Sequence, residues 1–133
     1  MIDGIRGTTN FNNVAWQGYQ GNDIVAVVDL GQIQRVRKLR AGFLQDVNSW
    51  IMMPSIVSFE VSIDGTNFVP VLSITNDVSP QNYEALIKDF SGTIAPHSAR
   101  YVRMRAQNFG KLPDWHPGAG GDAWIFVDEI IVR

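Results

Sequence analysis

Residues 57–74, VSFEVSIDGTNFVPVLSI, carry the pattern that decides the fold class. Over residues 57–63, apolar side chains alternate with Ser and Glu, which is the period of a strand with one buried and one exposed face. This strand ends at Asp64-Gly65, a pair that favours a tight hairpin turn because both residues tolerate positive φ. Residues 68–74 supply the returning strand. The stretch therefore predicts an antiparallel β-hairpin.

Strand patterns recur along the rest of the chain, at residues 24–30, 36–44, 100–106 and 124–132. Gly31 is expected to end the first of these strands. Helical periodicity is nearly absent, and only residues 82–89 are considered as a short helix. Several strands separated by turns, without helices to cover a parallel sheet, predict an all-β fold: an antiparallel β-sandwich of the jelly-roll type. The length of 133 residues predicts one domain over residues 1–133.

Charge and composition exclude several classes of partner. The net charge of −2 gives no electrostatic reason to bind nucleic acid or an anionic membrane. The basic residues near position 37 are interpreted as a solvated edge strand, where charge prevents aggregation, rather than as a polyanion site. Apolar runs such as Trp124 to Val127 are too short to cross a bilayer. The start Met1 to Gly4 shows no signal peptide, so we expect a module excised from a larger protein.

Catalysis by this domain is not expected. The chain contains two histidines and no cysteine, and no serine stands in a nucleophile-elbow context. A zinc site would need more His or Cys than the chain has. Nothing in the sequence sets the separation of a carboxylate pair such as Asp46 and Asp114, which glycoside hydrolysis would require.

Two loops stand out by length and composition. One is QDVNSWIMMP at residues 45–54, and the other is QNFGKLPDWHPGAGGDA at residues 107–123. Long loops in compact domains are usually functional or disordered. The second loop holds Trp115 and His116 between prolines and glycines, which favours a shaped surface over disorder.

The order of short motifs resembles the discoidin (coagulation-factor type C) family, which shares its fold with family 32 carbohydrate-binding modules. The motifs are Asp3-Gly4 with Thr8 and Trp16, "DLG" at 29–31, "SIDG" at 62–65, "ARYVR" at 99–103 and "DEI" at 128–130. The sequence segments IDGIRGTTNF, GFLQD, SWI and PDWHPGAGGDAW are similar to those of the C-terminal module of β-N-acetylhexosaminidases (chitobiases) of Bacteroidetes. The strand that precedes Asp3-Gly4 in the family is missing.

This resemblance implies a galactose-binding-domain-like jelly roll with a structural calcium ion and a shallow sugar site on loops at one end. The module would be non-catalytic and would hold a parent hexosaminidase close to its glycan. The expected ligand is a sugar of the galactose or N-acetylhexosamine type. The parent would place the module outside the cytoplasm, either secreted, periplasmic or on the cell surface.

The expected sugar site combines aromatic platforms with planar hydrogen-bonding groups, because a sugar presents an apolar C–H face and a rim of hydroxyls. Trp115 and Trp50 are the candidate platforms. Tyr19 joins them if the Gln17–Asn22 segment, interpreted as a loop, lies at the same end. The candidate hydroxyl partners are Gln45, Asp46, Asn48, Asp114 and His116.

Calcium requires a cage of oxygen ligands. The candidates are Asp3, the carbonyl near Arg6, Thr8 and Glu129, which together would tie the first loop to the last strand. The alternative is that Asp3 caps a turn and Glu129 pairs with an arginine.

Three further readings of the aromatic residues remain open. Trp50 stands beside Ile51-Met52-Met53 and could belong to a small satellite core, whereas Trp16 and Trp124 border strands and are expected in the core. A purely structural accessory domain that packs on the catalytic domain and binds no sugar would also expose aromatic residues. A lipid-binding or adhesive discoidin domain is the weaker alternative.

Overall fold

The structure is a computed structural model that describes residues 6–12 and 15–133. In chain order the elements are β1 (Gln17–Gln20), β2 (Ile24–Gln45), the 3-10 helix η1 (Val47–Ser49), β3 (Ile56–Ser62), β4 (Val69–Thr75), β5 (Leu86–Ala106) and β6 (Trp124–Val132). All strand pairs between these elements are antiparallel, in the order β1-β6-β2-β5-β3-β4. The expected all-β antiparallel jelly-roll fold is confirmed.

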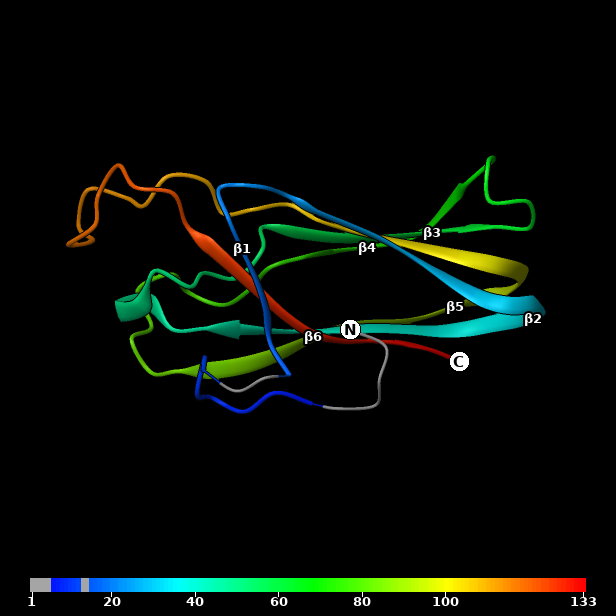
Figure 1. Cartoon of the computed structure of the whole chain (residues 1–133), viewed down its shortest axis with the longest axis horizontal. Coiled ribbons are helices and arrows are strands. Elements are labelled where there is room, and N and C mark those ends of the chain that lie inside the picture. The colour runs from blue at the N-terminus through cyan, green and yellow to red at the C-terminus, as the bar shows by residue number, and fades with distance from the viewer. Residues whose placement is uncertain (1–5, 13–14) are drawn as a thin grey trace.

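The two long strands β2 and β5 belong to both layers of the molecule (Figure 1). Residues 24–29 of β2 pair with residues 101–106 of β5, and there β5 also pairs with β3. Residues 38–45 of β2 pair with residues 86–93 of β5, and there β2 also pairs with β6. The ladder is irregular between these halves, where the paired ribbon turns from one layer into the other. One folded ribbon thus connects the two faces of the sandwich.

The irregular stretch explains one incorrect prediction. Residues 24–30 and 36–44 were expected as separate strands, but both lie in β2. Gly31 has φ of 83° and its N–H donates to Asp29 Oδ1 at 2.8 Å, so the backbone changes direction there without leaving the sheet. The pairing of β2 with strands on both sides also corrects the prediction that the basic residues occupy an edge strand.

Two other local predictions were wrong. The helix considered at residues 82–89 does not form: β5 begins at Leu86, because residues 86–89 pair with β2. The Gln17–Asn22 segment is not a loop, since Gln17–Gln20 form strand β1 against β6. The hairpin of β3 and β4 and the last strand β6 are confirmed within a residue or so.

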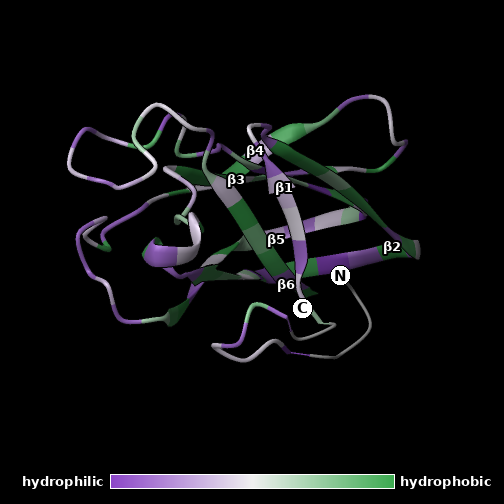
Figure 2. Ribbon diagram, turned by 60° about the vertical axis from the view of Figure 1, so that its left-hand side comes forward, coloured by the Kyte–Doolittle hydropathy of each residue, from purple (hydrophilic) through white to green (hydrophobic). Residues whose placement is uncertain are grey.

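The main core lies between the two layers and is largely apolar (Figure 2). Phe43 and Phe90 meet edge to face there, with ring centroids 5.4 Å apart, and Phe59 is fully buried beside them. Trp16 is buried as expected, in a second cluster with Leu44 and Ile51, against which Trp124 packs. A third, smaller cluster lies under the loops at one end.

Candidate functional site

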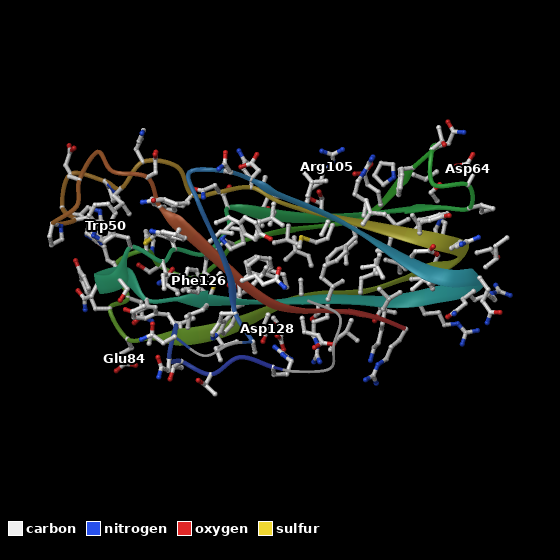
Figure 3. All side chains as sticks on the ribbon, viewed as in Figure 1. Trp50, Asp64, Glu84, Arg105, Phe126 and Asp128 are labelled. Atoms are coloured by element: carbon white, nitrogen blue, oxygen red, sulfur yellow. The ribbon has the colours of Figure 1, made fainter. Side chains whose placement is uncertain are left out.

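Three connecting segments gather at one end of the sandwich, which we call the loop end: residues 45–54, 76–85 and 107–123. Figure 3 shows Trp50 and Glu84 at this end, far from Asp64 in the β3–β4 turn. Two buried polar side chains hold the three segments together. Both were expected to face a sugar.

Gln45, the last residue of β2, joins the first segment to the second. Its side chain is almost fully buried, and its amide nitrogen donates to the carbonyls of Ser79 and Asn82 at 3.0 and 3.3 Å. Its amide oxygen accepts the N–H of Met53 at 3.4 Å. The amide of Gln45 therefore bonds within the chain, and its place in the structure is that of a tie between loops.

His116 joins the first segment to the third. It is 3% exposed, with Nε2 2.6 Å from the carbonyl oxygen of Val47. Its Nδ1 accepts the N–H of Gly118 at 2.8 Å. Both contacts fit the tautomer that carries its proton on Nε2. His116 thus closes the long loop onto η1 and presents no free ring nitrogen to solvent.

Trp50 belongs to the small core of the loop end. It follows η1 in the left-handed conformation, with φ of 68°, and packs against the cluster of Val47, Met52, Leu112 and Ala123. The glycine loop lies directly on the indole: a Cβ added at Gly118 would come within 2.5 Å of the ring. Trp50 therefore lies in a small satellite core, one of the two positions considered from the sequence.

Trp115 is the tryptophan that reaches the surface. It is 36% exposed, and its neighbour Tyr83 is 48% exposed. Their ring centroids lie 6.1 Å apart at an interplanar angle of 77°, an edge-to-face pair across two segments. Asp114, beside Trp115, is exposed. Sequence reasoning missed Tyr83, although an aromatic residue between a Ser-Pro turn and a strand was a usable signal.

The remaining sugar candidates lie apart from this aromatic pair. Asp46 is half-buried where the chain enters η1, and its backbone bonds to that of Ile51. Tyr19 is exposed on strand β1, opposite Ile125, and its hydroxyl lies 3.4 Å from Gln17 Oε1. The structure joins neither residue to Trp115 or Tyr83. Asn48 is exposed on η1.

The predicted calcium ligands lie where the first loop meets β6. Asp3 falls outside the described residues. The Arg6 guanidinium donates from Nε to Asp128 Oδ2 at 2.9 Å and also pairs with Asp89. These carboxylates raise the pKa of Arg6, with the hydrogen bond to Asp128 as the largest cause. The carbonyl of Thr8 accepts the indole N–H of Trp16 at 2.7 Å.

Asp128 is a carboxylate that ties the first loop to β6. Its side chain is fully buried, and its Oδ2 also accepts the N–H of Gly7 at 2.9 Å. Glu129 is buried next to it. Among the described residues, His, Asp and Glu side chains form no group of three suited to a metal. Calcium binding at this place stays a prediction.

Comparison with known protein families identifies the family of this chain. The family model of the F5/8 type C domain matches residues 1–125. The chain belongs to the F5/8 type C domain family. The resemblance noted in the sequence motifs is therefore confirmed across nearly the whole chain. No curated protein sequence matches this F5/8 type C domain.

Solved structures share the fold of this F5/8 type C domain at low sequence identity. CBM32-1 from a family 31 glycoside hydrolase of Clostridium perfringens aligns over 99% of this chain and 80% of its own, with 14% identity and a TM-score of 0.60. A chitosan-binding module from a chitosanase/glucanase of Paenibacillus sp. IK-5 aligns over 93% and 80%, with 20% identity and a TM-score of 0.59.

The C-terminal domain of a chitobiase from Bacteroides fragilis also matches, with 22% identity and a TM-score of 0.49 over 84% of this chain and 63% of that domain. The first two likenesses establish the fold alone, that of a carbohydrate-binding module of the CBM32 type. Within the described residues, no helix is long and apolar enough to cross a membrane.

Proposed function

We propose that this F5/8 type C domain is a non-catalytic carbohydrate-binding module whose sugar site is the exposed Trp115–Tyr83 pair at the loop end. The observation that carries this proposal is the pair itself: two aromatic rings from separate segments, both open to solvent and in edge-to-face contact. Aromatic faces of this kind pack against the C–H face of a pyranose ring. The neighbouring Asp114 carboxylate is a hydrogen-bond acceptor for sugar hydroxyls.

The buried ties beneath the pair give the site its rigidity. Trp115 is followed by His116, whose ring nitrogens are both bonded, and Tyr83 follows Asn82, whose carbonyl accepts from Gln45. Both aromatic rings therefore stand on backbone that is held in place before a ligand arrives. Such preorganisation lowers the entropic cost of binding, which matters for a shallow site with few contacts.

The parent protein proposed for this module is a β-N-acetylhexosaminidase of the chitobiase kind, acting outside the cytoplasm. Support comes from the motifs quoted above and from the two fold neighbours, one a chitosan-binding module and the other a module of a glycoside hydrolase. The proposed ligand is accordingly a terminal galactose or N-acetylhexosamine unit. The module would keep the enzyme near its glycan and leave the chemistry to the catalytic domain.

A calorimetric titration of the isolated chain tests the proposal. The panel contains galactose, N-acetylgalactosamine, N-acetylglucosamine and their oligomers, titrated against the natural sequence and the Trp115→Ala variant. The expected result is binding to at least one sugar that the variant loses. Silence across the panel from folded protein would reject the sugar site and favour an accessory domain that uses the same aromatic pair to pack on a catalytic domain.

A further inference from the structure

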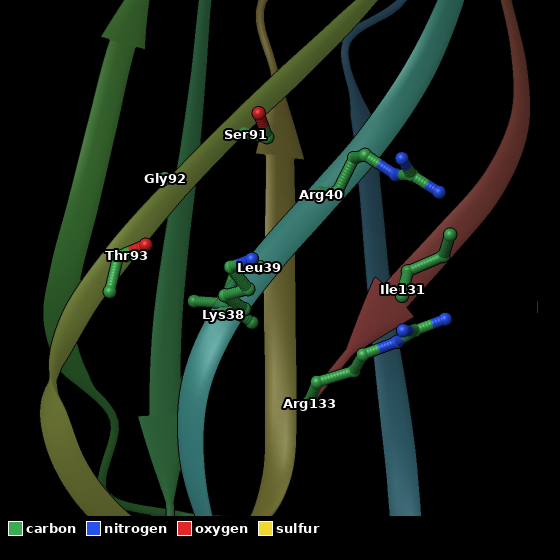
Figure 4. Close-up of a pocket in the computed structure, with 8 residues that line it drawn as sticks. All are labelled: Lys38, Leu39, Arg40, Ser91, Gly92, Thr93, Ile131 and Arg133. Atoms are coloured by element: carbon green, nitrogen blue, oxygen red, sulfur yellow. The ribbon is translucent and has the colours of Figure 1, made fainter.

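A hollow lies away from the loop end, on the outer face of β2, β5 and β6. It has a volume of about 320 Å³. Figure 4 shows Arg40 and Arg133 on either side of Ile131, with their guanidinium groups pointing the same way. We call this hollow the basic groove. Its lining consists of Lys38, Leu39, Arg40, Ser91, Gly92, Thr93, Ile131 and Arg133.

Three cationic side chains and no acidic side chain line the basic groove. Lys38 and Arg133 are brought together by strand pairing, because the Lys38 N–H donates to the Arg133 carbonyl at 2.8 Å and the Arg133 N–H donates to the Lys38 carbonyl at 3.0 Å. Neither side chain forms a salt bridge with any carboxylate that the structure describes. Arg40 reaches Asp89 at 3.5 Å, a loose pair at the margin of the groove.

Strand β5 adds hydroxyl groups opposite the cations. Ser91 is the register partner of Arg40, and Thr93 is the partner of Lys38. Both are exposed. The groove therefore offers positive charges on β2 facing hydroxyl groups on β5, and on each strand these side chains are spaced by the two-residue repeat of a sheet face. This pattern suits a chain that carries an anionic group on successive units.

We propose that the basic groove binds a linear acidic glycan through its carboxylate or sulfate groups. A guanidinium donates paired hydrogen bonds to the oxygens of such groups, and a lysine adds a point charge. The apolar side chain of Ile131 lies between the two arginines, where the C–H face of a sugar ring can pack. The site is separate from the Trp115–Tyr83 pair and does not depend on it.

The same lining disfavours other polyanions. The groove contains no aromatic side chain on which a nucleic-acid base could stack. Its apolar residues, Leu39 and Ile131, lie within the groove rather than on a protruding loop, so they cannot insert into a bilayer. The net charge of −2 for the whole chain also disfavours binding to a large anionic surface such as a membrane. Only the local positive charge of the groove attracts an anionic ligand.

The test measures binding of the full chain to two acidic polymers by affinity electrophoresis: polygalacturonate for carboxylates and dextran sulfate for sulfates, with uncharged dextran as the neutral reference. The double variant K38Q/R133Q removes the two cations without a salt bridge. We expect it to bind at least one acidic polymer about tenfold more weakly, the effect of losing charge-assisted hydrogen bonds. Binding of the natural chain should weaken with added salt.

Controls separate a site from general attraction and from the proposed sugar site. The matched variant R35Q/K111Q loses the same charge outside the groove and should keep its affinity. Trp115→Ala should keep its affinity for dextran sulfate, a polymer that is not of the galactose type proposed for the Trp115–Tyr83 pair. Equal losses in both double variants would overturn the proposal, as would no binding to either polymer. Equal or tighter binding to phosphatidylserine vesicles or to a single-stranded oligothymidylate would reject an acidic glycan as the preferred ligand.

Discussion

The two tryptophans of the loop end are expected to respond in opposite ways to replacement by alanine. Trp50 packs within the small core and supports the glycine loop, so its removal leaves a cavity under residues 118–121. Replacing a packed tryptophan by alanine lowers the free energy of unfolding by about 3 kcal/mol or more. Because Trp50 is only half-buried, the lower value applies to it. Trp50→Ala should therefore lower the free energy of unfolding by about that amount.

Trp115 should behave differently because its ring contacts are the edge-to-face pair with Tyr83 and a tilted contact with His116. One such aromatic pair contributes about 1 kcal/mol. For a domain of this size, about 1 kcal/mol corresponds to a melting temperature lower by about 3–5 °C, against about 10 °C or more for Trp50→Ala. Trp115→Ala should keep nearly all the stability and lose the sugar.

The assay is paired: urea unfolding followed by tryptophan fluorescence for stability, and calorimetric titration for binding, on both variants and the natural sequence. Trp115→Phe, which keeps an aromatic face, serves as the conservative control and should retain weak binding. The reasoning is refuted if Trp115→Ala destabilises as much as Trp50→Ala, because Trp115 would then be part of the core. It is equally refuted if both variants bind sugar normally.

Three other outcomes are expected. Glu60 accepts hydrogen bonds from Arg103 and Arg105, which lower its pKa to about 2. The carboxylate therefore stabilises the fold above its ordinary pKa, and this contribution is lost as the pH falls toward 2. Glu60→Gln should accordingly lose less stability than the natural chain between about pH 4.5 and 2, as measured by urea unfolding. Replacing Gln45 by Leu leaves the buried N–H of Met53 and two partly buried carbonyls without their partner and should cost about 2–3 kcal/mol by the same measurement, whereas a surface change such as Asn48→Ala should cost almost nothing. A chelator should lower the melting temperature and added calcium should restore it, as measured by calorimetry.

Each of these outcomes has a result that would contradict it. Identical acid profiles for Glu60→Gln and the natural chain would show that the arginine pairs do not persist in solution. Gln45→Leu without loss of stability would mean that its amide does not hold the loops. A melting curve that ignores both chelator and calcium would remove the metal from the description.

Local pattern was sufficient for the elements whose pairing is local. The hairpin of β3 and β4 was predictable because the period of two and the Asp64-Gly65 turn both lie within eighteen residues. The continuity of β2 was not predictable, because Gly31 interrupts the strand pattern. Only pairing with the distant strands β5 and β6 keeps both halves of β2 in the sheet. The same pairing with β2 makes residues 86–89 a strand instead of a helix.

The candidate site shows a similar division. The two long loops that carry Trp50 and Trp115 do lie together at one end of the sandwich, as expected. The roles of Gln45 and His116 were out of reach, because a buried side chain with tertiary partners has the same sequence signature as one that faces a ligand. The meeting of Lys38 with Arg133 depends on the register of β2 with β6, which no short motif encodes.

The folded ribbon of β2 and β5 has a kinetic consequence. Its register begins at Gln45 with Leu86 and ends at Ile24 with Ala106, partners that are separated by roughly 40 and roughly 80 residues of chain. Closing such distances is slow, so the domain should fold over milliseconds to seconds. Because this ribbon contributes to both layers, neither layer can open while the other stays closed. Hydrogen exchange in the two layers should therefore be governed by one common opening event.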